Sequence, residues 1–457
     1  MGIAIVMTVK NNTKLPREIA DRFTKPVARF LKIESAAGGL LLMAVLVALF
    51  LANSNWASTF LEFWETPVGL NFGSLDFTRS LRHWINDGLM TFFFFVISLE
   101  LKRELVLGEL RKPKQAALPL AAALGGMIVP VAIYLALIAG QPGAQGWGTV
   151  MATDTALAIG CLALFGKRIP TALRLFLLSL AIFDDVGAIL VVAVFYGEPL
   201  NWVVIGLAIL GLGLVAGFAR LGVRSIPMYF LIGGAVWLCI DASGIHATIA
   251  GVVLGLMTPT QVWVSDTRLR GILGRVLAYP GGEHWSGDTP DRRDLREAGR
   301  AVSESLSPVE RLEMTLHPWV GFVVMPVFAL ANAGVAIELG DFGQKIPIAI
   351  VAGLVLGKPL GVLGFSWLAV RSGLAVKPPD LSWPFLTAGA FLAGIGFTMS
   401  LFVASLAFDP TTLGAAKLGI LAGSTISATF GLFALLWLAT LSAGHLAGKQ
   451  GKCNHGA

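Results

Sequence analysis

Apolar stretches of roughly 17 to 25 residues, each long enough to cross the hydrocarbon core of a bilayer, recur along almost the whole chain. Short polar or Gly/Pro-rich turns separate them. Each stretch is predicted as a helix, because lipid cannot satisfy open backbone groups. Charged residues make up only 14% of the chain, against about 25% in a typical soluble domain. A soluble globular domain is therefore excluded, and we expect an all-α polytopic membrane protein.

About twelve spans can be assigned. They lie near residues 33–54, 83–107, 117–139, 149–165, 171–196, 201–219, 226–240, 243–260, 317–336, 346–371, 383–408 and 414–443. A tail over 1–32 carries seven basic residues and no apolar core of the length that a cleavable signal needs. A long polar segment over 262–316 is predicted as a cytoplasmic linker with some helix. We therefore expect a membrane domain over 33–443, followed by a tail over 444–457.

The basic residues are strongly asymmetric across these spans. Cytoplasmic loops collect Lys and Arg, and 29 of the 34 basic residues fall on the side of the amino terminus. The remainder are Arg79, Arg82, Lys345 and Lys417 on the other side, with Lys358 inside the tenth span. Both tails are therefore predicted to be cytoplasmic. The net charge of +6 is dispersed over faces that meet anionic lipid, so it does not indicate nucleic-acid binding.

Several ionisable residues lie inside predicted spans, where each costs roughly 2.5 to 3.5 kcal/mol on insertion scales. They are Asp87 and Glu100 in the second span, Asp154 in the fourth, Asp184 and Asp185 in the fifth, and Lys358 in the tenth. Consecutive helical residues point about 100° apart, so Asp184 and Asp185 are expected to have different partners and roles. One of them is the expected partner of Lys358. A simple salt bridge that closes a packing surface is the alternative for that pair.

Asp154 stands between Thr153 and Thr155 in a short apolar run. An interrupted helix here would offer hydroxyl and carbonyl oxygens beside a carboxylate, and small hard cations prefer such ligands. Taken alone, Asp154 could instead cap or kink a helix. The aspartate pair in the next span favours a cation site.

A second interruption is predicted at Gly394–Ser400, because two glycines weaken the eleventh span. Close helix packing is the alternative reading of those glycines. The two interrupted spans occupy corresponding places in two groups of three, 117–196 and 346–443, which would be inverted relative to one another. Interrupted helices in inverted repeats are typical of a transporter site. Asp154 and Lys358 would offset the partial charges of the facing helix ends.

The sequence resembles the NhaA-type sodium/proton antiporters of bacterial inner membranes, from about Phe30 to Leu438. The resemblance is carried, in the family's order, by WINDGLM, LELKREL, MATDTALAIG, AIFDDVGAI, GIHATIAGV, RLEMTLHPWV, FALANAGV, GLVLGKPLG and GIGFTMSLFVASLAF. It implies that Asp154 and Asp185 bind Na⁺ and exchange it for protons, with Thr153 nearby. It also implies that Lys358 pairs with Asp184.

The resemblance further implies a pH-sensing cluster. Its members here are Glu100, Arg103, Glu104, Arg311 and Glu313, and we group Asp87 with them. The residues alone indicate only a helical charge cluster, and Met314 stands where the best-known members have a histidine. His246 and His317 match family histidines but are left out of the core site.

The function expected is secondary exchange of cytoplasmic Na⁺ or Li⁺ for external protons by alternating access, for pH and sodium homeostasis, without an enzymatic step or a cofactor. Two rivals are a sodium-coupled symporter of an organic anion on the same fold and an intramembrane aspartyl protease, whose usual Gly-x-Gly-Asp context is missing. Residues 55–82 alternate like strands about Gly73 and match a dimerising hairpin of the family. A homodimer in contact with membrane lipids is expected.

Overall fold

The computed structural model describes residues 34–72, 75–197, 199–223, 225–277, 290–336 and 343–453. The predicted tail over 1–32 lies outside these ranges. The elements are α2 (Glu34–Ala52), α3 (Ala57–Trp64), β1 (Pro67–Phe72), β2 (Leu75–Ser80), α4 (Leu81–His83), η1 (Trp84–Leu89), α5 (Met90–Val106), η2 (Glu109–Arg111), α6 (Pro113–Ile138), η3 (Ala144–Val150), α7 (Thr155–Ala163), η4 (Gly166–Arg168), α8 (Thr171–Phe195), α9 (Trp202–Arg220), α10 (Ile226–Ala242), α11 (Thr248–Met257), α12 (Asp266–Leu277), α13 (Pro290–Glu304), α14 (Pro308–Trp319), η5 (Val320–Val324), α15 (Met325–Asn332), α16 (Lys345–Ala352), η7 (Gly353–Gly357), α17 (Lys358–Arg371), α18 (Trp383–Ala393), α19 (Phe397–Ala407) and α20 (Pro410–Cys453).

The described residues form a bundle of apolar helices, which confirms an all-α polytopic membrane protein. Within the described ranges, seven continuous helical segments are long and apolar enough to cross a membrane, or nine if each of two bent helix pairs counts as one span. Three of the seven contain a π-helical turn, at η1, η5 and η7. These wide turns continue the helix and shift its register by one residue.

The eighth predicted span, 243–260, is shorter in the structure than expected. Its helix α11 has only ten residues, Thr248–Met257. Gly244 adopts a φ of +86°, a left-handed conformation that glycine tolerates and that ends a helix. The apolar run therefore begins as a turn after α10, and hydropathy alone does not reveal this.

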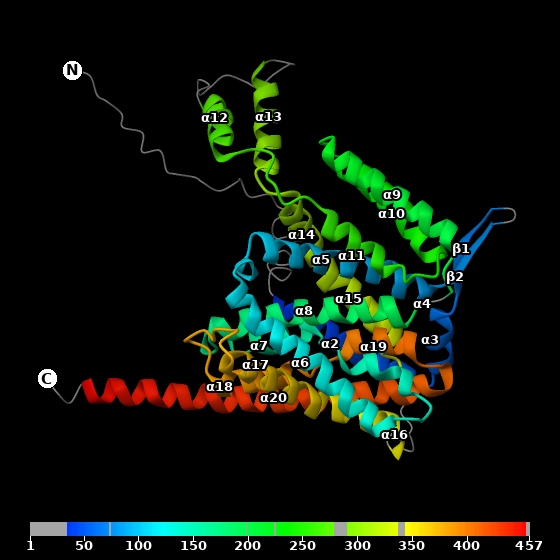
Figure 1. Cartoon of the computed structure of the whole chain (residues 1–457), viewed down its shortest axis with the longest axis vertical. Coiled ribbons are helices and arrows are strands. Elements are labelled where there is room, and N and C mark those ends of the chain that lie inside the picture. The colour runs from blue at the N-terminus through cyan, green and yellow to red at the C-terminus, as the bar shows by residue number, and fades with distance from the viewer. Residues whose placement is uncertain are drawn as a thin grey trace.

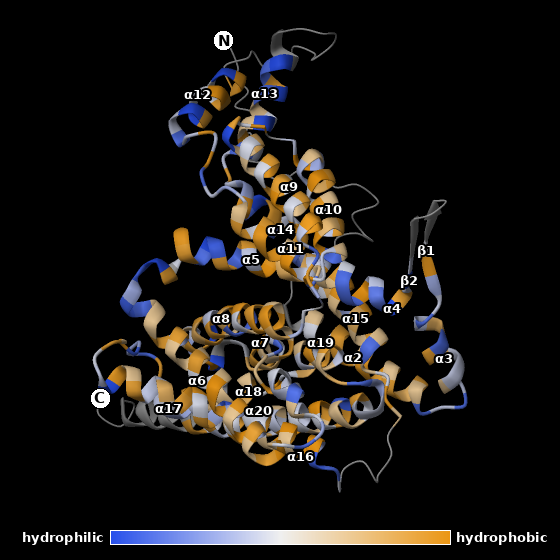
Figure 2. Cartoon of the chain, turned by 45° about the vertical axis from the view of Figure 1, so that its right-hand side comes forward, coloured by the Kyte–Doolittle hydropathy of each residue, from blue (hydrophilic) through white to orange (hydrophobic). Residues whose placement is uncertain are grey.

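The bundle divides into a compact part and a protruding part (Figure 1). Helices α6, α8 and α17–α20 lie together, with α7 and α19 near the centre. α9 and α10 pack on each other and stand to one side of this part. Both helices are largely apolar, as their orange colour shows in Figure 2, and many of their apolar side chains are exposed. Such a surface suits a lipid environment.

The predicted linker over 262–316 contains two amphipathic helices, α12 and α13, which extend away from the bundle (Figure 1). They pack on each other through Ile272, Ala298 and Ala301, together with Val264 just before α12. The next span begins at Pro308, nine residues before the predicted start at 317. Ser307 and Glu310 form a capping box there, and this starts the helix early.

The strand-like alternation about Gly73 corresponds to an antiparallel hairpin. β1 and β2 pair in a register that runs from Pro67 opposite Ser80 to Phe72 opposite Leu75. The hairpin projects from one end of the bundle (Figure 1). It leads directly into α4 and so into the second span.

Candidate functional site

Two interrupted helices meet at the centre of the compact part. η3 ends at Val150 and α7 begins at Thr155, with non-helical backbone over residues 152–154. α18 and α19 are separated at residues 394–396 and bent by 41°. The Asp154 backbone N–H donates to the Ile395 carbonyl at 2.6 Å. The two breaks predicted from the sequence therefore lie against each other, and each satisfies backbone groups freed by the other.

The Asp154 carboxylate caps two helices at once. Oδ1 accepts from the Leu157 N–H at 3.1 Å, as the N-cap of α7. Oδ2 accepts from the N–H of Thr398 at 3.1 Å and from its hydroxyl at 2.5 Å, at the start of α19. Helix N-termini carry partial positive charge. The fully buried carboxylate is therefore stabilised by two helix dipoles, as expected from the sequence.

Thr153 connects the same crossing to the next helix. Its hydroxyl lies 2.6 Å from Asp184 Oδ2 and 2.8 Å from the Ala393 carbonyl at the end of α18. A hydroxyl has one proton to donate. Thr153 can therefore serve the carboxylate or the helix end, but not both fully.

Asp184 and Lys358 form an ion pair within the bundle. Lys358 Nζ donates to Asp184 Oδ2 at 2.5 Å, and both side chains are 0% exposed. Among the described residues, the hydrogen bond and ion pair of Lys358 go to Asp184 and not to a helix end. The prediction that Lys358 offsets the partial charge of a helix terminus therefore stays a prediction.

Asp185 differs from its neighbour in its surroundings. It is 2% exposed, and its Oδ1 has no hydrogen-bond partner among the described residues. It lies within electrostatic range of Asp184, Asp154 and Lys358. Asp184 Oδ1 is also unpaired among the described residues, but the other oxygen of Asp184 already accepts from Lys358 and Thr153.

Glycine contacts between α6 and α17 set the position of Lys358. A Cβ on Gly361 would lie 2.0 Å from the Gly125 carbonyl oxygen, and one on Gly357 would lie 2.6 Å from Pro130 Cα. Only glycine permits such close backbone approach. A Cβ on Gly126 would lie 3.8 Å from Lys358 Nζ, so α6 forms one wall of the space that the lysine occupies.

The residues grouped as a pH-response cluster are only partly brought together. Arg103 contacts Glu313 at 2.5 Å and Glu104 at 2.9 Å, which joins α5 to α14. Glu100 lies within electrostatic range of Arg103 and Glu313. Arg311 instead donates to Ser303 of α13.

Asp87 lies apart from that cluster. It is thirteen residues before Glu100 on the same helical segment, which corresponds to about 20 Å along a helix. Its carboxylate contacts His83 at 3.0 Å. Asp87 therefore belongs to the end of the bundle that carries the hairpin.

The two histidines left out of the core site have other partners. His246 bonds the Tyr196 carbonyl through Nε2, and His317 lies within electrostatic range of Glu313.

Thr398 lies inside the interruption predicted at Gly394–Ser400, but the sequence does not connect it to Asp154. The signal was a hydroxyl directly after the glycine break, in the span that mirrors the fourth. The register between the two breaks is needed to turn that signal into a contact.

Comparisons with known proteins cover most of the chain. Residues 28–435 match the family model described as Na+/H+ antiporter 1. A Na(+)/H(+) antiporter NhaA of Rhizobium meliloti (strain 1021) is 62% identical, over 93% of this chain and 98% of that protein. The Na(+)/H(+) antiporter NhaA 2 of Acidiphilium cryptum (strain JF-5) is 58% identical, over 92% and 93%. That of Vibrio vulnificus (strain CMCP6) is 52% identical, over 94% and 96%.

Proposed function

We propose distinct roles for four buried residues, starting from the premise that this chain belongs to the Na+/H+ antiporter 1 family. The chain is a multi-pass membrane protein that exchanges Na⁺ for H⁺. This confirms the sequence-based prediction of a secondary transporter that is not an enzyme and needs no cofactor. The relatives give no support to the two alternatives, an organic-anion symporter and an aspartyl protease.

In this proposal Asp154 and Asp185 are the exchange site. The observation that carries it is the meeting of two helix breaks at Asp154, in the same buried group as Asp184, Asp185 and Lys358. Na⁺ is a hard cation and prefers oxygen ligands. Asp185 Oδ1 is such an oxygen, and it accepts no hydrogen bond among the described residues. A bound Na⁺ and a bound proton neutralise the same carboxylates, so binding of one releases the other.

Asp184 and Lys358 act as the charge partner of this site. Their ion pair keeps one carboxylate occupied in this conformation. Thr153 adds a second donor to the same oxygen. Loss of the Lys358 contact would leave Asp184 with the Thr153 hydroxyl alone, so opening of the pair and protonation of Asp184 are linked steps.

We extend the proposal to the whole membrane domain over 33–443. About twelve helices cross the bacterial inner membrane, both tails (1–32 and 444–457) lie in the cytoplasm, and 117–196 and 346–443 are inverted repeats. Alternating access to the central site then needs only movement of one helix group against the other. Li⁺ shares the site, since it is a small hard cation.

Two further parts complete the proposal. The β1–β2 hairpin joins two copies into a homodimer within the lipid bilayer. Its Val68 is exposed, and among the described residues no third strand pairs with either strand, so a second hairpin can add to an outer edge. Glu100, Arg103, Glu104, Arg311 and Glu313, with Asp87 at the other end, form the pH response. Arg103 joins two helices and is therefore the hub of that group.

The central assignment is tested by exchange in everted vesicles loaded with a pH-sensitive dye. Addition of Na⁺ or Li⁺ should dissipate the imposed proton gradient with the wild-type chain. Asp154→Asn and Asp185→Asn should each abolish the response while inserting normally. Asp380→Asn, in a loop, is the matched control and should exchange like the wild type. Full exchange by either central variant would refute the assignment.

A further inference from the structure

A cluster of possible metal ligands lies at the hairpin end of the bundle, apart from the central site. His83, Asp87 and Asp241 each offer one ligand atom, and these atoms all lie within 4.8 Å of one another. His83 Nε2 is 3.0 Å from Asp87 Oδ2. His83 and Asp87 come from the start of the second span, whereas Asp241 comes from the last turn of α10. Two segments far apart in the sequence thus converge on one point.

Asp241 is the residue that the rest of the fold does not explain. Its side chain is only 10% exposed, and it makes no hydrogen bond among the described residues. The nearest cation is Arg79 Nη2 of β2, at 3.8 Å, and the Arg79 side chain is 48% exposed. Moving most of a carboxylate out of water away from donors costs free energy, and a half-exposed guanidinium 3.8 Å away offsets little of that cost. Among the described residues, the Asp241 carboxylate thus has no cation within hydrogen-bonding distance.

The backbone around the cluster is held in place by packing. Asp87 lies in the π-helical turn η1, a feature that is frequent at functional sites. The Thr91 hydroxyl donates to the Asp87 carbonyl at 2.5 Å and accepts from Trp237 Nε1 at 2.9 Å. Trp237 also stacks on Trp84, with ring centroids 6.0 Å apart. These contacts hold η1, which carries Asp87, against α10, which carries Asp241.

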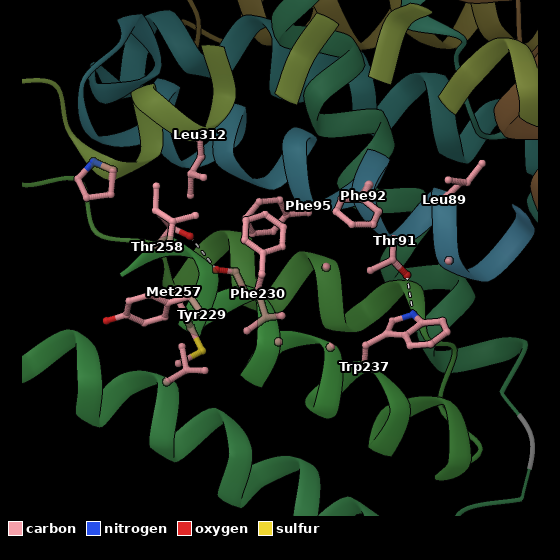
Figure 3. A pocket seen from close by; sticks show the side chains of 18 of the residues that line it. Leu89, Thr91, Phe92, Phe95, Tyr229, Phe230, Trp237, Met257, Thr258 and Leu312 are labelled. Atoms are coloured by element: carbon pink, nitrogen blue, oxygen red, sulfur yellow. Dashed lines mark hydrogen bonds between the residues drawn. The ribbon is translucent and has the colours of Figure 1, made fainter. Parts of the chain in front are cut away.

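The two tryptophans separate the cluster from an apolar cavity of about 860 Å³ between α5, α10 and α11. Figure 3 shows Trp237 bonded to Thr91 at one end of this cavity, with Phe92, Phe95 and Phe230 farther along it. Trp84 and Trp237 line both this cavity and the narrow gap around which His83, Asp87 and Asp241 are grouped. The ligand atoms therefore lie against an apolar wall, which favours ligation of an ion over full hydration.

We propose that His83, Asp87 and Asp241 bind a divalent transition-metal ion of the Zn²⁺ type. One imidazole nitrogen and two carboxylate oxygens are three of the ligands that Zn²⁺ accepts, and a water completes four. Zn²⁺ holds N and O ligands at about 2.0–2.2 Å, so the ligand atoms must draw together from their present spread. Side-chain rotation of the half-exposed His83 permits this. The site goes beyond Na⁺/H⁺ exchange and does not depend on it.

Charge complementarity supports this ion over Na⁺. Two carboxylates face His83, Arg79 and, within electrostatic range, His246, whose Nε2 is occupied by the Tyr196 carbonyl. A doubly charged ion balances both carboxylates and frees Arg79 to turn to solvent. A nitrogen ligand selects Zn²⁺, Co²⁺ or Ni²⁺ over Mg²⁺.

The test is equilibrium dialysis of the full-length, tag-free protein in detergent against Zn²⁺, with thermal unfolding as a second readout. The wild type should bind one Zn²⁺ per chain, and saturation should raise its melting temperature. His83→Gln and Asp241→Asn should each weaken binding by about tenfold or more, whereas Glu62→Gln, which changes an exposed carboxylate on α3, should not. Mg²⁺ should not compete.

Arg79→Gln is expected to change the Zn²⁺ affinity in the opposite direction from the ligand variants. Arg79 competes with the metal for Asp241, so its removal should tighten Zn²⁺ binding several-fold. Unfolding of the metal-free variants reports whether each is folded, and the Arg79 variant remains informative if a ligand variant is not. Absence of saturable binding by the wild type, unchanged affinity in both ligand variants, or weaker binding by Arg79→Gln would overturn the site.

Discussion

Lys358 Nζ lies 2.5 Å from Asp184 Oδ2, and neither side chain has any exposed surface. An ion pair buried this deeply adds little folding stability compared with an apolar pair of the same shape. Loss of one partner alone is strongly destabilising, because it leaves an uncompensated buried charge. The same pair borders the proposed exchange site. Structural and functional roles can therefore be separated by changing one partner or both.

Lys358→Met should destabilise the protein by about 3–5 kcal/mol, since it leaves Asp184 without its cation. Asp184→Asn should have a similar effect for the reverse reason. The double variant should recover most of that loss and yet fail to exchange Na⁺ for H⁺. Thermal unfolding in detergent and dye dequenching in vesicles measure the two properties. Simple additivity of the two losses would contradict direct coupling of the pair.

Thr398 holds Asp154 through its hydroxyl as well as its N–H. Thr398→Val keeps the N–H and the branched shape but removes the hydroxyl, and a hydrogen bond to a charged group is worth about 1.5–3 kcal/mol. Protons then compete better with Na⁺ for the carboxylate, because a donor to its charged form is lost. The Na⁺ concentration at half-maximal exchange should rise about tenfold, and less so at alkaline pH.

Thr398→Ser is the matched control, since it retains the hydroxyl. It should exchange with nearly wild-type Na⁺ dependence. A Ser variant as impaired as the Val variant would mean that packing of the methyl group, and not the hydrogen bond to Asp154, is what matters.

Much of this arrangement could be predicted because it follows from local composition. Apolar length predicts the helices, and the Thr-Asp-Thr and Gly-x-Gly runs predict both helix breaks. The positions of charges within spans single out Asp154, Asp184, Asp185 and Lys358. Each of these signals lies within a few consecutive residues, so it does not depend on how neighbouring helices pack.

The rest depends on how separate helices are aligned. Helix geometry alone leaves open which aspartate meets Lys358, because the register of α17 against α8 is set by glycine contacts with α6. The bond between Thr398 and Asp154 joins residues 244 positions apart. The convergence of His83 with Asp241 requires η1, a π-helical turn that apolar periodicity does not reveal.

The contact between α6 and α17 should tolerate no side chain at Gly361. Gly361→Ala would place a Cβ 2.0 Å from the Gly125 carbonyl oxygen, and such overpacking typically costs about 1–3 kcal/mol. Gly364→Ala on the same helix meets nothing within 4 Å. It should be neutral or slightly stabilising, because alanine favours helix by up to about 1 kcal/mol. Melting temperatures of the two variants should therefore move in opposite directions, and equal values would argue against the close approach.

Glu313 joins α14 to α5 through Arg103 at 2.5 Å and is only 6% exposed. Glu313→Gln keeps the shape and removes the charge, so Arg103 is left with Glu104 and nearby Glu100. If the cluster sets the pH response, the variant should keep the maximal exchange rate of the wild type but shift the pH of half-activation by about one unit, which corresponds to roughly 1.4 kcal/mol. Glu297→Gln removes an exposed partner of Arg275, and such surface pairs are worth about 0–1 kcal/mol, so its pH profile should stay unchanged. Exchange measured in vesicles from pH 6 to 9 decides whether Arg103 and Glu313 set the pH response or only hold α5 and α14 together. A lower maximal rate at an unshifted profile would assign Arg103 and Glu313 to helix packing alone.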